Sequence, residues 1–523
     1  MTFMDDMLNN HEQCYRALAA HDARFDGRIF VGCKTTRIYC RPICRVRLPR
    51  PENVDFYPSA AAAEAAGFRP CLKCRPELAP GSAVMDAAGQ LAHRAALLME
   101  ADPLDCSLEE VAAQLGITAR HLRRVFEQEY GTSPQQFLQT RRLLLAKNLL
   151  TDTKLPVTEV AYAAGFGSIR RFNDSFKSHY RLSPSRFRKD GLRSQAGLPQ
   201  VPGGGKANRG EASDTITLLL GYRPPLDFAG ILGFLAARTI DGVESVCADS
   251  YLRAVRLQRD GQVFSGWLAV RPAARRDALA VSVSTSLLPV LSAVLARLRC
   301  LFDLDCQPDL IHEHLSSMDN LRPAAGEPGA SINILGVRVP GCFDAFEMAT
   351  RAILGQQVTV KAARTLANRM AVELGEPLRT PFAELTRTFP SAECIAALPE
   401  PVADILGPLG VTGTRARAIR ALAEALTSGY IELSPAADAP QSMQRLLELP
   451  GFGPWTVQYV AMRALHWPDA FPHGDYGVKL ALKRLLGSAE HPPPKQILAL
   501  AEDWRPWRSY ATMNLWKSLS SGE

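Results

Sequence analysis

The sequence predicts a multidomain protein that is mainly α-helical with α+β parts. Its 523 residues are too many for one hydrophobic core, so about three or four domains are expected. Five of the twelve cysteines lie between Cys33 and Cys74, which sets the N-terminal segment apart. A helical unit of about fifty residues then occurs twice in tandem. A later stretch, Gly191 to Ala212, is rich in Gly and Pro without hydrophobic period and is expected to be a flexible linker.

These features set the expected domain boundaries. Beyond the linker, strand-like runs begin at Ile216 and Ala278 around a helical run, and the pattern from about Phe343 onward is mostly helical. The expected parts are a cysteine-rich α/β domain (1–80), the repeated helical segment (85–190), the linker (191–212), a small α+β domain (213–310) and a helical body (311–523).

Composition excludes membrane and export classes. The hydrophobic fraction of 47% and the charged fraction of 22% are typical of globular proteins. No apolar run reaches the ~18 residues that span a bilayer. The first residues are acidic and lack the apolar core of a signal peptide. The sequence therefore predicts a cytoplasmic protein without a membrane partner.

The net charge of +7 is concentrated in one segment. Between Arg120 and Lys189 there are 14 Lys and Arg against 5 Asp and Glu, so this stretch carries +9 and the remainder about −2. Clustered positive charge indicates a polyanionic partner.

The cysteine pairs have the spacing of a metal site. Cys40 and Cys44 form a C-x3-C pair, and Cys71 and Cys74 form a C-x2-C pair after 26 intervening residues. Two such pairs bring four thiolates into the tetrahedron that Zn²⁺ accepts. On spacing alone, an inert zinc staple and a reactive zinc-bound thiolate are equally compatible. We expect Cys33 to be a small buried residue rather than a ligand.

A resemblance favours the reactive thiolate. The runs Thr35–Cys44 and Ala66–Glu77, with Glu52-Asn53-Val54 between them, closely resemble the N-terminal domain of the Ada methylation-response family over about residues 10–78. The resemblance implies that Cys40 is both a zinc ligand and the acceptor of a methyl group from DNA methylphosphotriesters. It also implies that Cys44, Cys71 and Cys74 are the supporting ligands. Zinc keeps a thiol deprotonated at neutral pH, and the thiolate is the nucleophile.

Each copy of the helical repeat contains a helix-turn-helix pattern. In the first, Ser107 and Glu110 form a capping box, and Thr118 caps a second helix that carries Arg123 and Arg124. In the second, Ser168 caps a helix with Arg170 and Arg171 on its polar face. Its residues Phe172, Phe176 and Tyr180 share one face and are expected in the core.

The helical segment resembles the AraC-type DNA-binding domain, especially at Gly165-Phe166, Phe172, Phe176-Lys177 and Ser183-Pro184. The resemblance implies that two recognition helices enter major-groove segments ~34 Å apart. Double-stranded promoter DNA and RNA polymerase are therefore expected partners, and the four arginines Arg123, Arg124, Arg170 and Arg171 are expected to contact DNA.

A helix–hairpin–helix signature lies in the helical body. Its sequence runs from Leu449 through Gly451 and Gly453 to Thr456. The two glycines allow a tight hairpin whose backbone N–H groups, with the following helix N-terminus, bind a DNA phosphate. Asp475 follows Gly453 by 22 residues, in a turn expected to lie near the hairpin.

The C-terminal half, from about Thr217 to Trp516, resembles the AlkA-type 3-methyladenine DNA glycosylases. The resemblance rests on the hairpin, on Asp475, and on the runs Leu232–Arg238, Arg351–Gln356 and Trp504–Ala511. It implies that Asp475 stabilises the cationic sugar formed during base loss. It further implies a pocket of electron-rich rings for the extruded base. The matching positions are Trp455, Tyr459 and Trp516, although each could equally belong to a helical core.

Departures from related enzymes narrow the expected activity. Trp455 stands where bifunctional relatives have the Schiff-base lysine, so a monofunctional enzyme is expected. Gln357 stands where some AlkA-type enzymes insert an apolar wedge into the base stack. Because glutamine is polar, the identity of the wedge residue stays open. Because no cysteine follows Cys394, an iron–sulfur cluster is not expected. A Pro-Cys-His-Arg motif of guanine-alkyl methyltransferases is also absent.

The preferred interpretation is a monomeric protein that joins a methyl sensor, a transcription activator and a DNA-3-methyladenine glycosylase. The alternative is a transcription regulator whose glycosylase half binds DNA without excising bases. In a third interpretation, the N-terminal domain is a structural module held together by zinc, and Cys40 accepts no methyl group.

Overall fold

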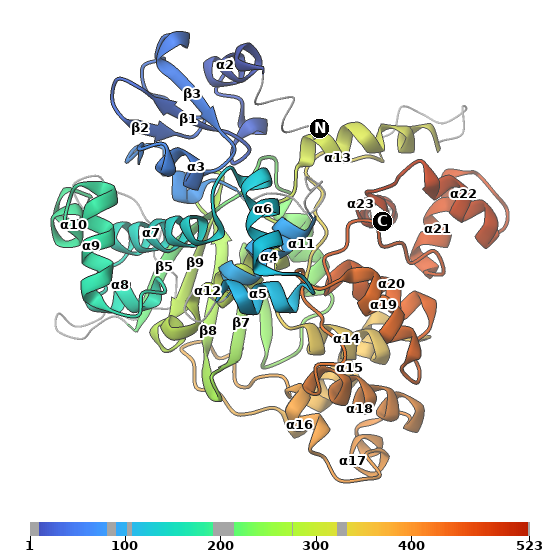
Figure 1. Cartoon of the computed structure of the whole chain (residues 1–523). Coiled ribbons are helices and arrows are strands. Elements are labelled where there is room, and N and C mark those ends of the chain that lie inside the picture. Colours follow the sequence, from blue (N-terminus) through green and yellow to red (C-terminus); the bar gives the residue numbers. More distant parts are fainter. Residues whose placement is uncertain are drawn as a thin grey trace. The chain divides into compact units, whose positions relative to one another are not determined.

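A computed structural model describes residues 10–80, 90–101, 107–191, 214–274, 276–321 and 332–520 (Figure 1). The chain divides into two compact units. The first contains residues 1–224, 255–299 and 304–306, and the second contains residues 225–254, 300–303 and 307–523. Apart from Gly191, the expected linker lies outside the described residues.

The N-terminal domain is the expected α/β domain. Its four-stranded sheet has the order β3-β1-β2-β4, in which β1 is antiparallel to both neighbours and β2 is parallel to β4. The elements are α2 (His11–Ala19), β1 (Phe30–Cys33), β2 (Ile38–Cys40), β3 (Val54–Tyr57), α3 (Ala60–Ala65) and β4 (Arg69–Pro70), with 3₁₀ turns η1 (Ala23–Phe25), η2 (Pro51–Asn53) and η3 (Pro76–Leu78).

The repeated segment folds into two similar helical subdomains. Its helices are α4 (Gln90–Ala101), α5 (Leu108–Gln114), α6 (Ala119–Tyr130), α7 (Pro134–Asp152), α8 (Val157–Ala163), α9 (Ile169–Tyr180) and α10 (Pro184–Gly191). The predicted Ser107 capping box is present, and Thr118 and Ser168 cap α6 and α9 as expected. Phe172, Phe176 and Tyr180 are buried, so the predicted core face of α9 is confirmed.

The long helix α7 joins this segment to the N-terminal domain within the first unit. The buried Lys147 ammonium pairs with Glu77, and Arg75 donates to Asp152 Oδ1 and Asn148 Oδ1, both at 2.8 Å. Buried charges are tolerated only when paired, so these contacts hold the two parts in one arrangement. Arg75 directly follows Cys74, which links this network to the cysteine cluster.

The predicted strands around Ile216 and Ala278 belong to a five-stranded sheet of order β5-β9-β8-β7-β6. The pairs β5–β9, β8–β9 and β6–β7 are antiparallel. The strands are β5 (Thr215–Gly221), β6 (Glu244–Cys247), β7 (Ser250–Arg259), β8 (Gln262–Pro272) and β9 (Ala278–Ser284), followed by η6 (Thr285–Val290) and α12 (Leu291–Leu301).

The second unit is mainly helical. Its helices are α11 (Phe228–Ala236), α13 (Pro308–His314), α14 (Ala345–Leu354), α15 (Val360–Leu374), α16 (Ala392–Ala396), α17 (Ala403–Leu406), α18 (Gly413–Thr427), α19 (Ala439–Glu448), α20 (Pro454–Arg463), α21 (Tyr476–Leu485), α22 (Pro494–Glu502) and α23 (Arg508–Ser520), with 3₁₀ turns η7 (Leu315–Leu321) and η8 (Gly407–Leu409). The multidomain, mainly α fold class is therefore confirmed. In the described part of the chain, none of the helices is both long and apolar enough to cross a bilayer.

The aromatic core of the second helical subdomain yields a stability prediction. Phe176 is fully buried and packs its ring against Phe172, Tyr180 and Phe187 at centroid distances of 5.5, 4.3 and 5.5 Å. Phe176→Ala is expected to destabilise this subdomain by about 3–5 kcal/mol, because the lost ring leaves a cavity. The measurement is the urea concentration at which residues 107–191 become sensitive to protease.

The matched control is Tyr162→Ala on α8, because Tyr162 is 51% exposed and its removal creates no cavity. Equal protease sensitivity of the two variants would contradict the assigned core.

Candidate functional site

The four predicted cysteine ligands converge in the N-terminal domain. Parallel pairing of β2 with β4 places Cys40, at the end of β2, beside Cys71, which directly follows β4. Short turns then return Cys44 and Cys74 to the same point. The four sulfur atoms lie within 4.8 Å of one another.

This donor set fits Zn²⁺. In a tetrahedron with Zn–S bonds of ~2.3 Å, the sulfurs lie ~3.8 Å apart, which agrees with the observed cluster. Four thiolates so close would repel strongly without a cation. Backbone N–H groups of Lys73 and Arg41 donate to the sulfurs of Cys71 and Cys74 at 3.4 and 3.3 Å. Such bonds stabilise the thiolate form.

The expectation that Cys33 is a buried residue is wrong. Cys33 is partly exposed at the end of β1, and its sulfur lies 3.2 Å from Thr35 Oγ1. Its position at the last residue of β1, next to the turn that leads to β2, explains the exposure. The sulfur does not belong to the cluster of four.

The helix-turn-helix arginines are placed as predicted. Arg123 and Arg124 lie exposed on α6, and Arg170 and Arg171 lie exposed on α9. Because the aromatic residues of both helices face the core, the guanidinium groups are presented to solvent and are available to phosphates.

The helix–hairpin–helix motif consists of α19, the turn at Leu449–Gly453, and α20. Gly451 has φ +80°, so this position requires glycine. Gly453 instead has an extended φ of −99° and precedes α20. The expectation that both glycines serve the turn geometry therefore holds only for Gly451. A Cβ at position 453 would meet no atom within 4 Å.

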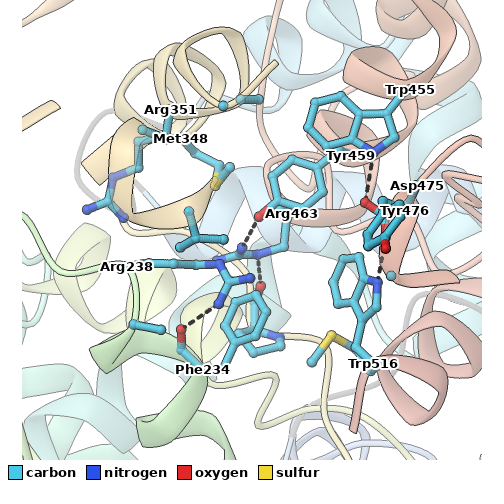
Figure 2. Close-up of a pocket in the computed structure, with 18 of the residues that line it drawn as sticks. Phe234, Arg238, Met348, Arg351, Trp455, Tyr459, Arg463, Asp475, Tyr476 and Trp516 are labelled. Carbon is cyan, nitrogen blue, oxygen red and sulfur yellow. Dashed lines mark hydrogen bonds between the residues drawn. The ribbon is translucent and has the colours of Figure 1, made fainter. Parts of the chain in front are cut away.

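An aromatic cavity of about 1510 Å³ lies beside this hairpin, within the second unit. It contains the predicted ring positions Trp455, Tyr459 and Trp516 (Figure 2). The rings of Trp455 and Tyr459 are stacked, with their centroids 5.4 Å apart and an interplanar angle of 9°. The ring centroid of Trp516 lies 6.2 Å from that of Tyr459. Because all three rings border the cavity, they are not simply core residues.

The Asp475 carboxylate lies in the same cavity and is fixed by three donors. Trp455 Nε1–H donates to Oδ2 at 3.1 Å, and Trp516 Nε1–H donates to Oδ1 at 2.9 Å (Figure 2). The backbone N–H of Val478 also donates to Oδ1 at 3.1 Å, so Asp475 is the N-cap of α21. The cap fixes the backbone, and the two indoles fix the plane of the carboxylate.

Gln357 lies at the mouth of the cavity, between α14 and α15. Its side chain is exposed, and its backbone has φ +55°, a left-handed conformation uncommon for a residue with a side chain. The neighbouring Gln356 donates to Gly451 O at 2.8 Å and to Thr456 Oγ1 at 2.9 Å. These bonds tie the Gln357 turn to the helix–hairpin–helix motif.

The sequence analysis missed three cavity residues: Phe234, Arg238 and Arg463. Phe234 and Arg238 are four residues apart, as are Tyr459 and Arg463. In α20 this spacing places Tyr459 and Arg463 on one helical face and could have identified Arg463, whereas Arg238 lies in the turn that follows α11. Burial raises the pKa of Tyr459, but the nearby Arg463 and Arg238 outweigh burial and hold this pKa below its usual value.

The fold and these sites define a multidomain DNA-binding protein that combines a zinc–thiolate centre with a helix–hairpin–helix base pocket. Comparison with family models agrees along the chain. Residues 13–77 match the metal binding domain of Ada, and residues 111–190 match a helix-turn-helix domain. Residues 217–344 match the AlkA N-terminal domain, and residues 350–506 match the HhH-GPD superfamily of base excision DNA repair proteins.

Curated relatives cover both halves. A probable bifunctional transcriptional activator/DNA repair enzyme AlkA of Mycobacterium tuberculosis is 38% identical over 98% of this chain and 97% of its own length. DNA-3-methyladenine glycosylase 2 of Escherichia coli is 37% identical over 57% of this chain and 95% of its own. The bifunctional activator/repair enzyme Ada of E. coli is 34% identical over 32% of this chain and 45% of its own. The chain belongs to the family of bifunctional transcriptional activators and DNA repair enzymes that join Ada-type and AlkA-type domains.

The cysteine geometry predicts zinc stoichiometry. The purified chain is expected to contain one zinc ion, and Cys71→Ala is expected to lose it, because three thiolates leave the tetrahedron incomplete. Metal analysis by mass spectrometry measures the content. Cys33→Ala is the matched control and should retain one zinc, since Cys33 lies outside the cluster. Zinc retained by Cys71→Ala would contradict the assigned ligand set.

Proposed function

We propose that the C-terminal half excises alkylated bases of the 3-methyladenine type from double-stranded DNA as a monofunctional glycosylase. The observation that carries the proposal is the Asp475 carboxylate, fixed by two indole N–H groups in an aromatic cavity beside a helix–hairpin–helix motif.

The proposed reaction uses the chemistry of the damaged base. A purine alkylated on a ring nitrogen is positively charged, so it leaves with the electron pair of its glycosidic bond without prior protonation. Positive charge then develops on the sugar, and the fixed negative charge of Asp475 stabilises it. Water adds to C1′ and loses a proton, which leaves an abasic site. Because Trp455 carries no amine, the strand is not cleaved through a Schiff base.

The surrounding residues are assigned by position. The rings of Trp455, Tyr459 and Trp516 hold the extruded cationic base through cation–π contacts. The hairpin at Gly451 and Gly453 binds a backbone phosphate through N–H groups and the α20 N-terminus. Gln357, held at the cavity mouth in a left-handed turn, fills the space that the extruded base vacates.

We further propose that Cys40 accepts a methyl group from a DNA methylphosphotriester. The thiolate attacks the methyl carbon, an S–C bond forms, the C–O bond breaks, and the phosphodiester anion leaves. Cys71 and Cys74 accept N–H bonds that reduce their nucleophilicity, which suits supporting ligands together with Cys44. When bound, zinc keeps the thiolates deprotonated.

The helix-turn-helix arginines Arg123, Arg124, Arg170 and Arg171 are proposed to bind promoter DNA, with RNA polymerase as the partner in activation. Because each DNA site is contacted through two tandem subdomains of one chain, a monomer suffices. Both proposed substrates are DNA, and we propose that the protein acts on them in the cytoplasm. The proposed domains are the methyl-acceptor domain (1–80), the helix-turn-helix segment (85–190), the linker (191–212), the small α+β domain (213–310) and the glycosylase body (311–523).

Asp475→Asn is expected to lower base release from 3-methyladenine DNA by about 10²-fold or more, because the amide removes the charge that opposes the sugar cation. Single-turnover base release measures the effect. The matched control is Asp438→Asn, because Asp438 also caps a helix, accepting from Gln441 N at 3.0 Å, but lies outside the cavity.

Asp438→Asn should keep wild-type release. If both variants release the base at the wild-type rate, Asp475 has no catalytic role. If the wild type binds DNA but releases no base, the C-terminal half is a DNA-binding module of a regulator.

Methylation of Cys40 is expected to tighten promoter binding. Four thiolates and one zinc ion carry −2, and methylation of one sulfur reduces this to −1, which weakens repulsion of the DNA polyanion. The measurement is promoter affinity before and after exposure to methylphosphotriester DNA, at several salt concentrations. Cys40→Ser cannot gain the methyl group, whereas Cys33→Ser should behave as wild type. Equal affinities of the methylated and unmethylated forms at low salt would contradict the switch.

A further inference from the structure

One edge of the five-stranded sheet lies against the methyl-acceptor domain within the first unit. β5 stands at the end of the sheet order and pairs with β9 on one side, which leaves its other edge to a different partner. On β5, Leu219 is 2% exposed and forms a small buried cluster with Ala278 and Ala280 of β9. Leu78, the last residue of the η3 turn, completes this cluster. A side chain of the methyl-acceptor domain therefore covers this face of β5.

Close packing at this contact requires a small residue on β5. Gly221 and Leu219 lie on the same face of the strand, two residues apart. A Cβ atom at position 221 would lie 1.8 Å from Leu78 O, so the two atoms would overlap. Gly221 does not have a positive φ, and the need for glycine therefore comes from the contact and not from the backbone conformation. The backbone of η3 thus passes directly over β5.

A buried arginine makes a second contact between the same two parts. Arg223 follows β5 by two residues and is 1% exposed. Its Nε donates to Asp26 O of the methyl-acceptor domain at 3.0 Å. Its Nη1 donates to Asp305 O at 2.6 Å and to Cys306 O at 3.3 Å, in the segment after α12. Because a buried guanidinium is stable only when its donors are satisfied, Arg223 holds these segments together.

Both contacts lead back to the cysteine cluster. The η3 turn begins two residues after Cys74, so Leu78 lies four residues beyond a zinc ligand. Arg41 directly follows the ligand Cys40. Its side chain donates to Cys74 O at 3.2 Å and to Asp26 Oδ1 at 2.8 Å. The positions of Leu78 and Asp26, which contact the AlkA-type half, therefore depend on a closed cluster.

We propose that β5 and Arg223 form a docking surface for the zinc-loaded methyl-acceptor domain, and that this docking couples zinc binding to the structure of the AlkA-type half. Without zinc, the cysteines no longer fix Cys74 and Arg41, so η3 loosens and the outer edge of β5 becomes exposed. Zinc binding and docking therefore favour each other by one common factor, because such coupling is reciprocal. Since both partners lie in one chain, a small contact is enough for docking. The inference rests on zinc binding by the four cysteines and on neither proposed reaction.

Gly221→Ala tests the coupling in the full chain. The added methyl group blocks the contact with Leu78 O and leaves the four cysteines unchanged, and alanine is no worse than glycine within a strand. The matched control is Gly167→Ala, because Gly167 also lies in the first unit without a positive φ, and a Cβ there would meet no atom within 4 Å. Two quantities are measured for each chain. They are the hydrogen exchange of the β5 and β9 amides with and without zinc, and the zinc affinity in competition with a chelator.

In the wild type, zinc removal is expected to speed exchange in β5 by about fivefold or more. In Gly221→Ala, β5 should exchange at the fast rate whether or not zinc is bound. By reciprocity, Gly221→Ala should bind zinc about fivefold or more weakly than the wild type, whereas Gly167→Ala should match the wild type in both measurements. β9 is paired on both sides, so its exchange should stay slow in every form, which shows that the sheet is folded.

Leu78→Ala is measured in parallel, because it weakens the same contact from the other side and leaves the sheet unchanged. It should shift β5 exchange and zinc affinity in the same direction as Gly221→Ala. Unchanged β5 exchange on zinc removal from the wild type would overturn the proposal, as would wild-type zinc affinity in Gly221→Ala and Leu78→Ala. A wild-type chain that binds no zinc would overturn the assigned metal site as well.

Discussion

The three hydrogen bonds to the Asp475 carboxylate determine the geometry of the base pocket. They come from α20, α21 and α23, so one side chain joins the helix after the hairpin to the helix that it caps and to a helix near the C-terminus. The indoles that orient the carboxylate also form walls of the cavity. Loss of either indole would therefore remove both an aromatic wall and a donor to the carboxylate. A fixed carboxylate needs no reorganisation as positive charge develops nearby, and this preorganisation is the main source of electrostatic catalysis.

The N-terminal domain uses fixed charge in another way. Pairing of β2 with β4 places Cys40 and Cys71 side by side, and two short turns bring Cys44 and Cys74 to them. The four residues, which are mostly buried, form a negatively charged thiolate centre. Arg75, next to the ligand Cys74, is bonded to α7 of the helix-turn-helix segment. A change of charge at the cluster thus arises close to α7, which belongs to the same helical segment as the arginines that we propose to bind DNA. The proposed repair and signalling roles depend on the same four sulfurs.

Much of this organisation could be predicted from local patterns. Cysteine spacing identified the metal ligands, and caps such as Ser107 and Thr118 identified helix starts, because both signals act over a few residues. Cys33 was misjudged because the exposure of a residue at the end of a strand depends on tertiary packing, which the local sequence does not show. Arg238 and Arg463 were missed because the cavity that they line forms only where segments distant in the sequence, such as α11 and α20, meet in the fold. The two bonds from tryptophans to Asp475 could not be predicted for the same reason.

The central claim is that Asp475 stabilises positive charge on the sugar. Binding of a transition-state mimic tests it most directly, since such mimics bind more tightly than ground-state analogues. Affinity is measured for two duplexes that carry, at the abasic position, either a cationic pyrrolidine ring or a neutral tetrahydrofuran ring. We expect the cationic duplex to bind at least about 10²-fold more tightly to the wild type, and Asp475→Asn to abolish most of this difference. Equal binding of both duplexes by the wild type, or a preference that survives in Asp475→Asn, would contradict the account.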